Sequence, residues 1–310
     1  MAEEKNGTLV DQLLYKAKLI RDESQKTFAC DLLAEFVCQV EQQGNASGMH
    51  VGPFLSQRIA QMDEIISDQL NEILHHKDFQ KLEGSWRGLN HLVSKTMTGT
   101  SLKLRLLNIT KDELKKDLEK AVEFDQSQLF KKVYEEEYGT FGGNPYSALV
   151  ADFYFGRNPI DIEILDKLSN VAAAAHAPVI TAAHPKMFDV ESYEDLGVPR
   201  DLSKLFESLE LVKWNSFRGS EDSRYVTLAL PRVLFRLPYD SEKNPAEGLA
   251  FNEDASGADS SKFCWGNPAY VLAERITNAF AIYGWTAAIR GVEGGGIVEG
   301  LPAYTFKSTD

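Results

Sequence analysis

A chain of 310 residues is long enough to bury a large core, in one large domain or in two smaller ones. Its 43% of apolar and 25% of charged residues are ordinary for a soluble globular protein. The formal net charge of -13 disfavours nonspecific binding to nucleic acid and to anionic membranes, so we expect neither as a partner.

The N-terminus and the cysteines both favour a cytoplasmic protein. Residues 1–7 are polar and lack the apolar core of a signal peptide. The longest run of small apolar residues, 171–183, is well short of the ~20 residues that span a bilayer, so we expect no membrane insertion. Cys30, Cys38 and Cys264 form no C-x-x-C motif, and we expect packed thiols rather than disulfides or metal ligands.

Residues 1–50 are predicted to form a helical N-terminal arm. Apolar residues recur at helical spacing in two segments between residues 8 and 43. Residues 44–48 break this pattern and predict a hinge. Two amphipathic helices cannot cover their own apolar faces, so the arm either docks on its own domain or binds a neighbouring subunit; the sequence leaves both open.

Residues 51–100 are predicted to be a helical segment that packs on the core. One apolar stripe runs from Phe54 to Leu74, and a second runs from Phe79 to Val93. His75 and His76 lie between the stripes. Because adjacent residues of a helix point to different faces, this pair is a poor metal site.

From residue 101 to residue 310, strand and helix signals alternate. The order predicts an α/β fold, a largely parallel mixed sheet flanked by helices, preceded by the helical N-terminal region. Thr110 and Glu113 form a capping box, and Pro159 suits the first turn of a helix. The predicted strands are 102–109, 148–155, 178–183 and 225–230, and the predicted helices are 110–122, 127–137 and 159–175.

The last third of the chain contains a predicted edge strand between Pro231 and Pro238, with its arginines pointing outward. Residues 245–261 are polar and predict an exposed insertion, and residues 285–290 are predicted as the last strand. Asn267-Pro268 is predicted to cap a long helix. Its expected inward residues are Leu272, Ile276, Ala279, Phe280 and Tyr283, and its expected outward residues are Glu274, Arg275, Thr277 and Asn278.

Residues 291–302 hold the densest run of glycines. Neither a Lys-Ser nor a Lys-Thr pair follows them, so this is not a P-loop, and the spacing does not fit G-x-G-x-x-G. Glu293 and Glu299 within the run would repel a phosphate. The loop is therefore predicted to serve close backbone approach rather than anion binding.

Catalysis is weakly indicated. An open parallel sheet binds ligands at the carboxyl ends of its strands. There His176, His184, Asp152 and Arg157 could meet as acid-base groups. Structural hydrogen bonds and ion pairs explain these residues more simply. We expect no catalytic residue, cofactor or metal, and keep an α/β enzyme with a site at this edge as the alternative function.

Aromatic, arginine and glycine residues mark candidate interaction surfaces. The carboxylates of Glu135, Glu136 and Glu137 fan apart on a helix, which predicts a solvated face or a contact for a basic partner. Packing within the chain explains any one of the candidates equally well. The residues singled out for contacts with other proteins are Trp86, Phe141, Trp214, Arg218, Arg232, Arg236, Gly294, Gly295 and Gly296.

Seven segments stand out in order between residues 79 and 302. They are Leu82-Glu83-Gly84-Ser85-Trp86-Arg87-Gly88-Leu89, Glu123-Phe124-Asp125-Gln126-Ser127, Tyr134-Glu135-Glu136-Glu137-Tyr138-Gly139-Thr140-Phe141-Gly142-Gly143, Asp152-Phe153-Tyr154-Phe155-Gly156-Arg157, residues 172–178, Trp265-Gly266-Asn267-Pro268-Ala269-Tyr270 and the glycine loop. Together they resemble the large subunit of type VI secretion contractile sheaths, the VipB/TssC type of the EvpB family. The first 50 residues resemble it only loosely.

The resemblance implies a structural protein, not an enzyme. Such a subunit pairs with a small sheath subunit and stacks with other copies of itself in helical rings around an inner tube protein. Contraction drives the tube into a target cell envelope, an AAA+ ATPase recycles the contracted form, and strand exchange links neighbouring subunits. Large sheath subunits continue beyond Asp310, so the C-terminal part of the family domain is expected to be absent. A soluble helical adaptor built on residues 8–94 is a further alternative.

Overall fold

The computed structural model describes residues 23–42, 51–197, 201–255, 260–286 and 288–302. The chain divides into two compact units, Met1–Ile66 and Ser67–Asp310. The described part of the first unit holds helix α2 (Lys26–Gln42), after a short 3-10 turn, and the first part of helix α3 (Val51–Leu74). The helix expected near residues 8–20 and the hinge expected at 44–48 lie outside the described residues.

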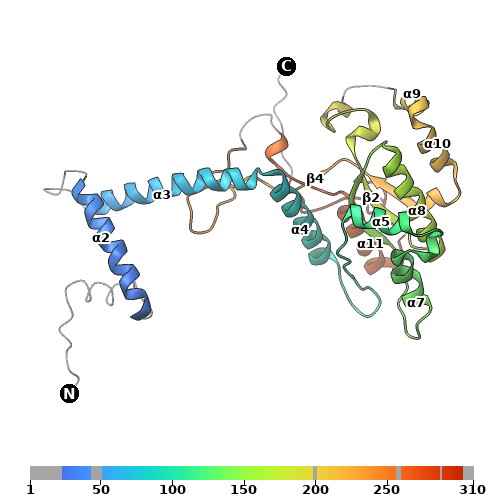
Figure 1. The fold of residues 1–310 in the computed structure, drawn as a ribbon, viewed down its shortest axis with the longest axis horizontal. Helices are drawn as coiled ribbons and strands as arrows, with labels where there is room; N and C mark the ends of the chain where they lie inside the picture. Colours follow the sequence, from blue (N-terminus) through green and yellow to red (C-terminus); the bar gives the residue numbers. More distant parts are fainter. Residues whose placement is uncertain (1–22, 43–50, 198–200, 256–259, 287, 303–310) are drawn as a thin grey trace. The chain divides into compact units, whose positions relative to one another are not determined.

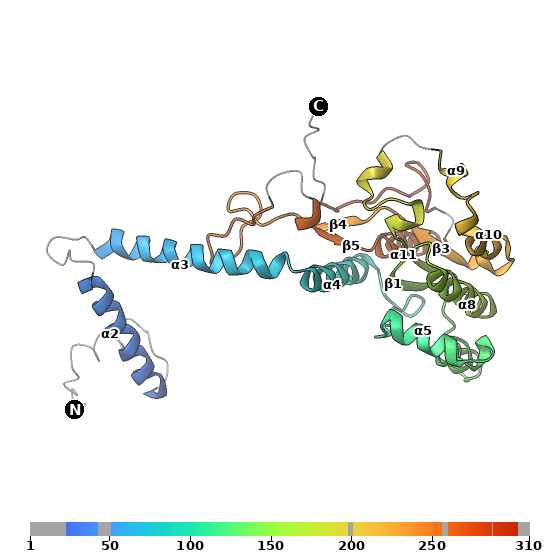
Figure 2. The same cartoon turned by 45° about the horizontal axis from the view of Figure 1, so that its top comes forward.

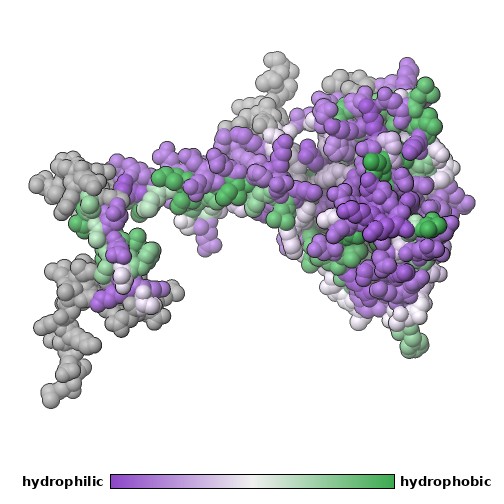
Figure 3. Space-filling view, viewed as in Figure 1, coloured by the Kyte–Doolittle hydropathy of each residue, from purple (hydrophilic) through white to green (hydrophobic). Residues whose placement is uncertain are grey.

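Helix α3 has an exposed apolar stripe, which we call the α3 stripe. Its members lie at alternating steps of four and three residues, interrupted once at Gln69. This is the spacing with which one helix packs along another. Figure 3 shows apolar side chains along one side of the helix. The α3 stripe consists of Leu55, Ile59, Met62, Ile66 and Ile73, each between 42% and 54% exposed.

The second unit is built on a three-stranded parallel sheet in the order β1-β2-β3. Strand β1 (Leu149–Phe155) pairs with β2 (Val179–Ala183), which pairs with β3 (Val226–Ala229). Helix α8 (Pro159–Ala175) crosses from β1 to β2, with Pro159 in its first turn as predicted. The central strand β2 is buried at every residue, as expected for a parallel strand with both neighbours present.

Helices cover both faces of this sheet (Figures 1 and 2). Successive residues of a strand point to opposite faces. Phe153 and Phe155 of β1 pack with α8 and with α5 (Lys111–Lys120), whereas Asp152 points to the opposite side. There α4 (Lys77–Lys95) and α11 (Ala269–Tyr283) pack on each other, and α11 lies on the sheet.

The remaining elements are short. The predicted capping box of Thr110 and Glu113 is present at the start of α5. The helix predicted at 127–137 is present, with Ser127 as its cap and a π-helical turn in its middle. These elements are α6 (Gln128–Phe130), the π-helical turn Lys131–Glu135, α7 (Glu136–Tyr138), α9 (Leu202–Leu205), α10 (Val212–Gly219) and an antiparallel pair, β4 (Val233–Arg236) with β5 (Cys264–Gly266).

Two predicted strands are wrong. Residues 102–109 belong to no ladder, although their composition favours a strand. A strand needs a hydrogen-bonded neighbour, and no described segment supplies one. The described residues of 285–290 form no strand either: Arg290 makes only an isolated bridge to Gly294. The parallel sheet is thus smaller than the sequence predicts.

The predicted faces of α11 are wrong in part: Ala279 is buried as predicted, but three other residues are not where they were expected. Glu274 and Thr277, expected outside, are buried, whereas Tyr283, expected inside, is 59% exposed. Helix α11 is covered by α4 on one side and by the sheet on the other, so most of its circumference lies in the core. The buried Glu274 carboxylate is accommodated by an ion pair with Arg275, the next residue.

The segment predicted as an exposed insertion is partly buried. Phe251, Glu253 and Ala255 are at most 9% exposed, and Phe251 packs against Tyr239.

The edge strand is present as β4, but Arg236 points inward and is 6% exposed. Cys38 is exposed, while Cys264 is buried as expected.

Candidate functional site

Helix α4 is fixed to the second unit by two small residues. A Cβ atom at Gly84 would lie 2.5 Å from the carbonyl oxygen of Trp265 in β5, and one at Gly88 would collide with the ring of Tyr270 in α11. The helix therefore approaches its neighbours more closely than any other residue type would allow at these positions. This close packing defines which side of α4 faces the core.

Asp152 of β1 ties α4 to the sheet and to α11. Its carboxylate accepts a short hydrogen bond from the Ser85 hydroxyl. Burial and the negative charge of Asp152 together raise the pKa of the Tyr270 phenol in α11. Asp152 is therefore a structural acceptor, as the simpler interpretation predicted, although its partners are hydroxyl groups rather than an arginine or a helix N-terminus.

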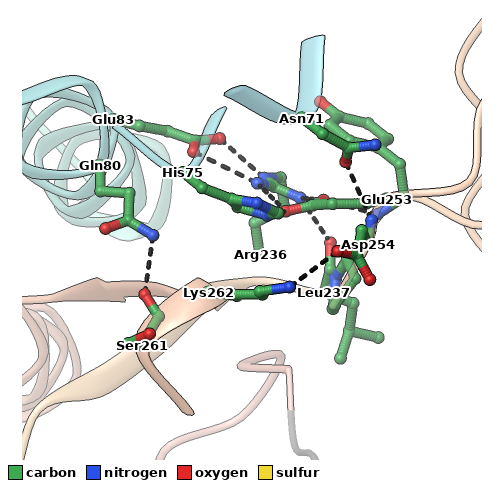
Figure 4. A network of polar contacts seen from close by, with 12 residues as sticks. Asn71, His75, Gln80, Glu83, Arg236, Leu237, Glu253, Asp254, Ser261 and Lys262 are labelled. Atoms are coloured by element: carbon green, nitrogen blue, oxygen red, sulfur yellow. Dashed lines mark hydrogen bonds and ion pairs between the residues drawn. The ribbon is translucent and has the colours of Figure 1, made fainter. Parts of the chain in front are cut away.

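A buried ion-pair network joins α4 to β4 and to the segment before β5 (Figure 4). Arg236 donates from Nε to Glu83 Oε1 at 2.7 Å and from Nη1 to Glu253 Oε2 at 2.5 Å. Glu253 Oε2 also accepts from the backbone N–H of Tyr239 at 2.9 Å, and Glu253 Oε1 lies 3.3 Å from His75 Nε2. One guanidinium thus links three segments that are far apart in sequence.

Glu83 is charged in this network. Burial alone would raise the pKa of its carboxyl, but hydrogen bonds and charge from Arg236 and Arg87 outweigh the burial and hold the pKa below its usual value. Arg87 lies one turn further along α4, with its Nε 2.7 Å from Glu83 Oε1. Two carboxylates and two guanidinium groups therefore balance each other.

The outer side of α4 carries apolar side chains that nothing in the described structure covers. Leu82, Trp86 and Val93 are 54%, 61% and 49% exposed, and we call them the α4 stripe. The predicted stripe from Phe79 to Val93 is divided between two faces, because Leu92 packs inward against Tyr270 and Ala273. Trp86, a predicted interaction residue, is thus accessible to a partner.

Residues 102–109 form a second accessible apolar surface, which we call segment 102–109. Leu104, Leu106 and Leu107 are 37%, 70% and 47% exposed. Within the described chain, no backbone hydrogen bond joins residues 103–109 to another segment. Its position is set by side chains: Lys103 Nζ lies 2.9 Å from Asn144 Oδ1, and Arg105 pairs with Glu137.

Glu137 is the anchor of the loop that presents Phe141. It is 8% exposed, so the solvated face predicted for residues 135–137 is wrong at this position. Its carboxylate accepts from the backbone N–H of Asn144 at 2.8 Å, and this bond lowers the pKa of Glu137 despite burial. Phe141, between the two, is fully exposed and contributes nothing to the described core.

The glycine loop has the close backbone approach that was predicted. Gly291 and Gly295 have φ angles of 64° and 78°, values that favour glycine. A Cβ at Gly296 would lie 2.8 Å from the Gly291 nitrogen, and one at Gly294 would collide with the Arg290 carbonyl. The loop folds back on itself through bonds of 3.2 Å (Arg290 to Gly294) and 2.9 Å (Gly296 to Gly291).

The remaining predicted interaction residues lie apart from α4. Trp214 and Arg218 of α10 line a cavity beside β3. Arg232 is exposed, with its guanidinium 5.6 Å from the ring centre of Tyr193. Only Arg236, in the ion-pair network, is out of reach of a partner. Contacts of the others with another protein stay a prediction.

The residues considered for catalysis have separate structural partners. His184 accepts from the backbone N–H of Lys186 at 3.1 Å, and His176, in a left-handed conformation at the end of α8, lies 3.4 Å from the Tyr225 hydroxyl. Arg157 pairs with Asp189 at 2.6 Å. No shared hydrogen bond links these groups within the described residues.

Two features of the described residues concern metal binding and membrane insertion. No three His, Cys, Asp or Glu side chains there stand close enough together to hold a metal ion. No helix among them has the length and apolar character needed to cross a bilayer.

Sequence reasoning missed the ion-pair network and the unpaired state of segment 102–109. Glu83, Arg236 and Glu253 are too far apart in the sequence for a single chain to signal their pairing. The strand composition of segment 102–109 was visible, but the absence of a neighbouring strand was not.

Comparison with known proteins identifies the architecture. Residues 56–310 match the family model for the EvpB/VC_A0108 tail sheath N-terminal domain (VipB). The type VI secretion system sheath protein TssC1 of Pseudomonas aeruginosa is 51% identical over 254 residues, which cover 81% of this chain and 51% of that protein. The chain thus spans about half the length of this relative. The match extends over most of the chain, and the chain belongs to the EvpB (VipB/TssC) family of tail sheath proteins.

Proposed function

We propose that this chain is a large-type subunit of a type VI secretion contractile sheath in the cytoplasm. It pairs with a small sheath subunit, and the pairs assemble with further copies around an inner tube protein whose ejection delivers effectors. An AAA+ ATPase recycles the contracted form. The family match supports this role, as does the relative's designation as a sheath protein.

The main observation behind the proposal is the amount of apolar surface that the described residues leave exposed. The α3 stripe, the α4 stripe and segment 102–109 together expose large aliphatic and aromatic side chains in three places. A monomeric soluble protein seldom leaves such surfaces open, and extended ones mark contacts with other proteins. An enzyme needs a convergent set of polar groups; a sheath subunit needs surfaces of this kind.

Segment 102–109 suits pairing with a strand from another chain. The backbone donors and acceptors of residues 103–109 are unpaired within the described residues, and leucines alternate with basic residues from Leu102 to Leu106. Addition of an extended strand would satisfy the backbone and cover Leu106, the most exposed of its leucines. We therefore assign this segment to strand addition during assembly.

Co-expression with the small sheath subunit of the same gene cluster tests the proposal. A tag on the small subunit should recover this chain in a stable complex through size-exclusion chromatography, and negative-stain electron microscopy should show rods or tubules. The control is the tagged small subunit expressed with an unrelated acidic protein of similar size. Recovery of a folded chain without the small subunit in repeated preparations would contradict the proposal.

A further inference from the structure

A cavity of about 400 Å³ lies between α10 and the β3 edge of the parallel sheet. Ala183 and Leu230, at the carboxyl ends of β2 and β3, contribute to its wall. Open α/β sheets bind ligands at this end of their strands, and small-molecule sites commonly enclose ~300–1,000 Å³. None of the α4-stripe residues lines this cavity.

Aromatic rings form much of the cavity wall. Phe188, Phe206, Trp214 and Phe217 follow one another, with ring centres 6.1, 6.5 and 5.7 Å apart from each ring to the next. Met187 and three aliphatic residues of β3 and its end complete the apolar part. Such a wall favours a flat apolar group, because aromatic rings in contact gain from stacking or edge-to-face packing.

The donors that this wall offers a ligand are the N–H groups of Arg218, because the Ser223 hydroxyl already donates within the chain. Arg218 is the one charged residue that lines the cavity, and no hydrogen bond or ion pair of its guanidinium occurs within the described part of the chain. The hydroxyl of Ser223 is directed to the carbonyl oxygens of Ser220, at 2.8 Å, and of Arg218, at 3.1 Å. Trp214 Nε1 is itself buried and has no acceptor among the described residues.

An anionic group meets these donors best. A guanidinium binds a carboxylate through two parallel hydrogen bonds, and such charge-assisted bonds exceed neutral ones in strength. A cationic ligand would face Arg218 with no counter-charge from the wall.

We propose that this cavity binds an aromatic carboxylate, with the ring against Phe206 and Trp214 and the carboxylate on Arg218. The same chemistry is available from a free aryl acid or from a protein segment in which an aromatic residue adjoins an acidic one. The proposal does not depend on the sheath function, because the cavity is complete within one chain.

Two matched pairs of probes test the proposal on the purified 310-residue chain. The free-acid pair is 4-phenylbutyrate and 4-phenylbutanamide, which differ in charge and hardly in shape. The peptide pair is acetyl-Phe-Glu-amide and acetyl-Phe-Gln-amide. Dissociation constants are measured by titration of the indole N–H signals in NMR spectra, with the Trp214 signal assigned from Trp214→Phe.

The carboxylate of at least one pair should bind about tenfold more tightly than its amide, since a charge-assisted hydrogen bond is worth roughly that factor. Arg218→Gln should remove this preference and leave the amide affinity unchanged. Arg224→Gln, at an exposed arginine paired with Glu221, is the control and should keep the preference. Preference for the free acid alone identifies a small-molecule source, and preference for the peptide alone identifies a protein source.

Equal affinity for acid and amide, or a carboxylate preference that survives Arg218→Gln, would overturn the proposal. The proposal would also be overturned if none of the four probes bound to the folded protein at a concentration 10-fold above a millimolar dissociation constant. Phe206→Ala tests whether the probes bind in the cavity or elsewhere on the protein surface. It should weaken the binding of acid and amide alike, and unchanged affinities would contradict binding in the cavity.

Discussion

Arg236 stabilises two buried carboxylates, and its removal should be costly. Breaking a buried ion pair by truncating one partner costs about 3–5 kcal/mol, because the remaining charges stay buried and unpaired. Arg236→Met should therefore lower the free energy of unfolding by about this amount. Arg232→Met, at an exposed arginine four residues earlier, should change it by less than ~0.5 kcal/mol. Urea unfolding followed by circular dichroism measures both, and equal effects would contradict the described network.

The charge of Glu83 predicts a pH dependence of stability. Its pKa is lower in the folded protein than the usual 4.5, so its contribution is fully present above pH 4.5 and is lost as the pH falls through the folded-state pKa. The difference in free energy of unfolding between the wild type and Glu83→Gln should therefore be largest near pH 6 and shrink toward pH 3. Urea titrations at stepped pH give this difference, and a gap that widens on acidification would show that Glu83 is not held charged.

At the scale of single residues, local signals were predictable and long-range pairs were not. The cap at Thr110 and the first-turn position of Pro159 depend on neighbours within one helical turn, and the sequence displays those neighbours. The inward position of Arg236 depends on Glu83 and Glu253, 153 and 17 residues away. Without knowledge of Glu83 and Glu253, an arginine between two prolines on an edge strand is predicted to be exposed.

Helix α4 depends on glycine where it meets β5. A Cβ at Gly84 would meet a backbone carbonyl oxygen, which cannot turn aside as a side chain can. Gly84→Ala should therefore destabilise the protein by about 1–3 kcal/mol despite the better helix propensity of alanine. Gly219 ends α10 and has open space where its Cβ would be, so Gly219→Ala should be neutral or stabilising by up to ~1 kcal/mol. Thermal unfolding distinguishes the two, and a stabilised Gly84→Ala would mean that α4 does not pack this closely.

At the scale of elements, the sequence predicts β1, α8, β2 and β3 because each has its own apolar pattern and its own residues that begin or end it. It fails at segment 102–109 and at residues 285–290, where composition favours a strand but pairing decides the outcome. It also fails on α11, because a helix covered on both sides has no clear polar face. The unpaired state of segment 102–109 is the basis of our proposal that a strand from another chain pairs with it.

For the whole molecule, the family could be recognised from ordered motifs, and the structure explains several of them. Gly84 and Gly88 permit the packing of α4, Asp152 links α4, α11 and the sheet, and the glycines of 291–296 fold a tight loop. Other parts of the motifs, such as Trp86 and Phe141, have no packing role within the described residues. Their exposure agrees with the assembly role proposed here.

Co-purification of α4-stripe variants with the small sheath subunit tests the central claim most directly. Combined Leu82→Ser and Trp86→Ser substitutions remove exposed apolar surface, so the monomer should stay folded while recovery with the tagged small subunit falls at least tenfold, equivalent to ~1.4 kcal/mol of lost contact. The control is Ile160→Ser, which removes an exposed apolar side chain from the start of α8, away from the stripe. It should leave recovery unchanged. Full recovery of the double variant would contradict the assignment of this surface to assembly.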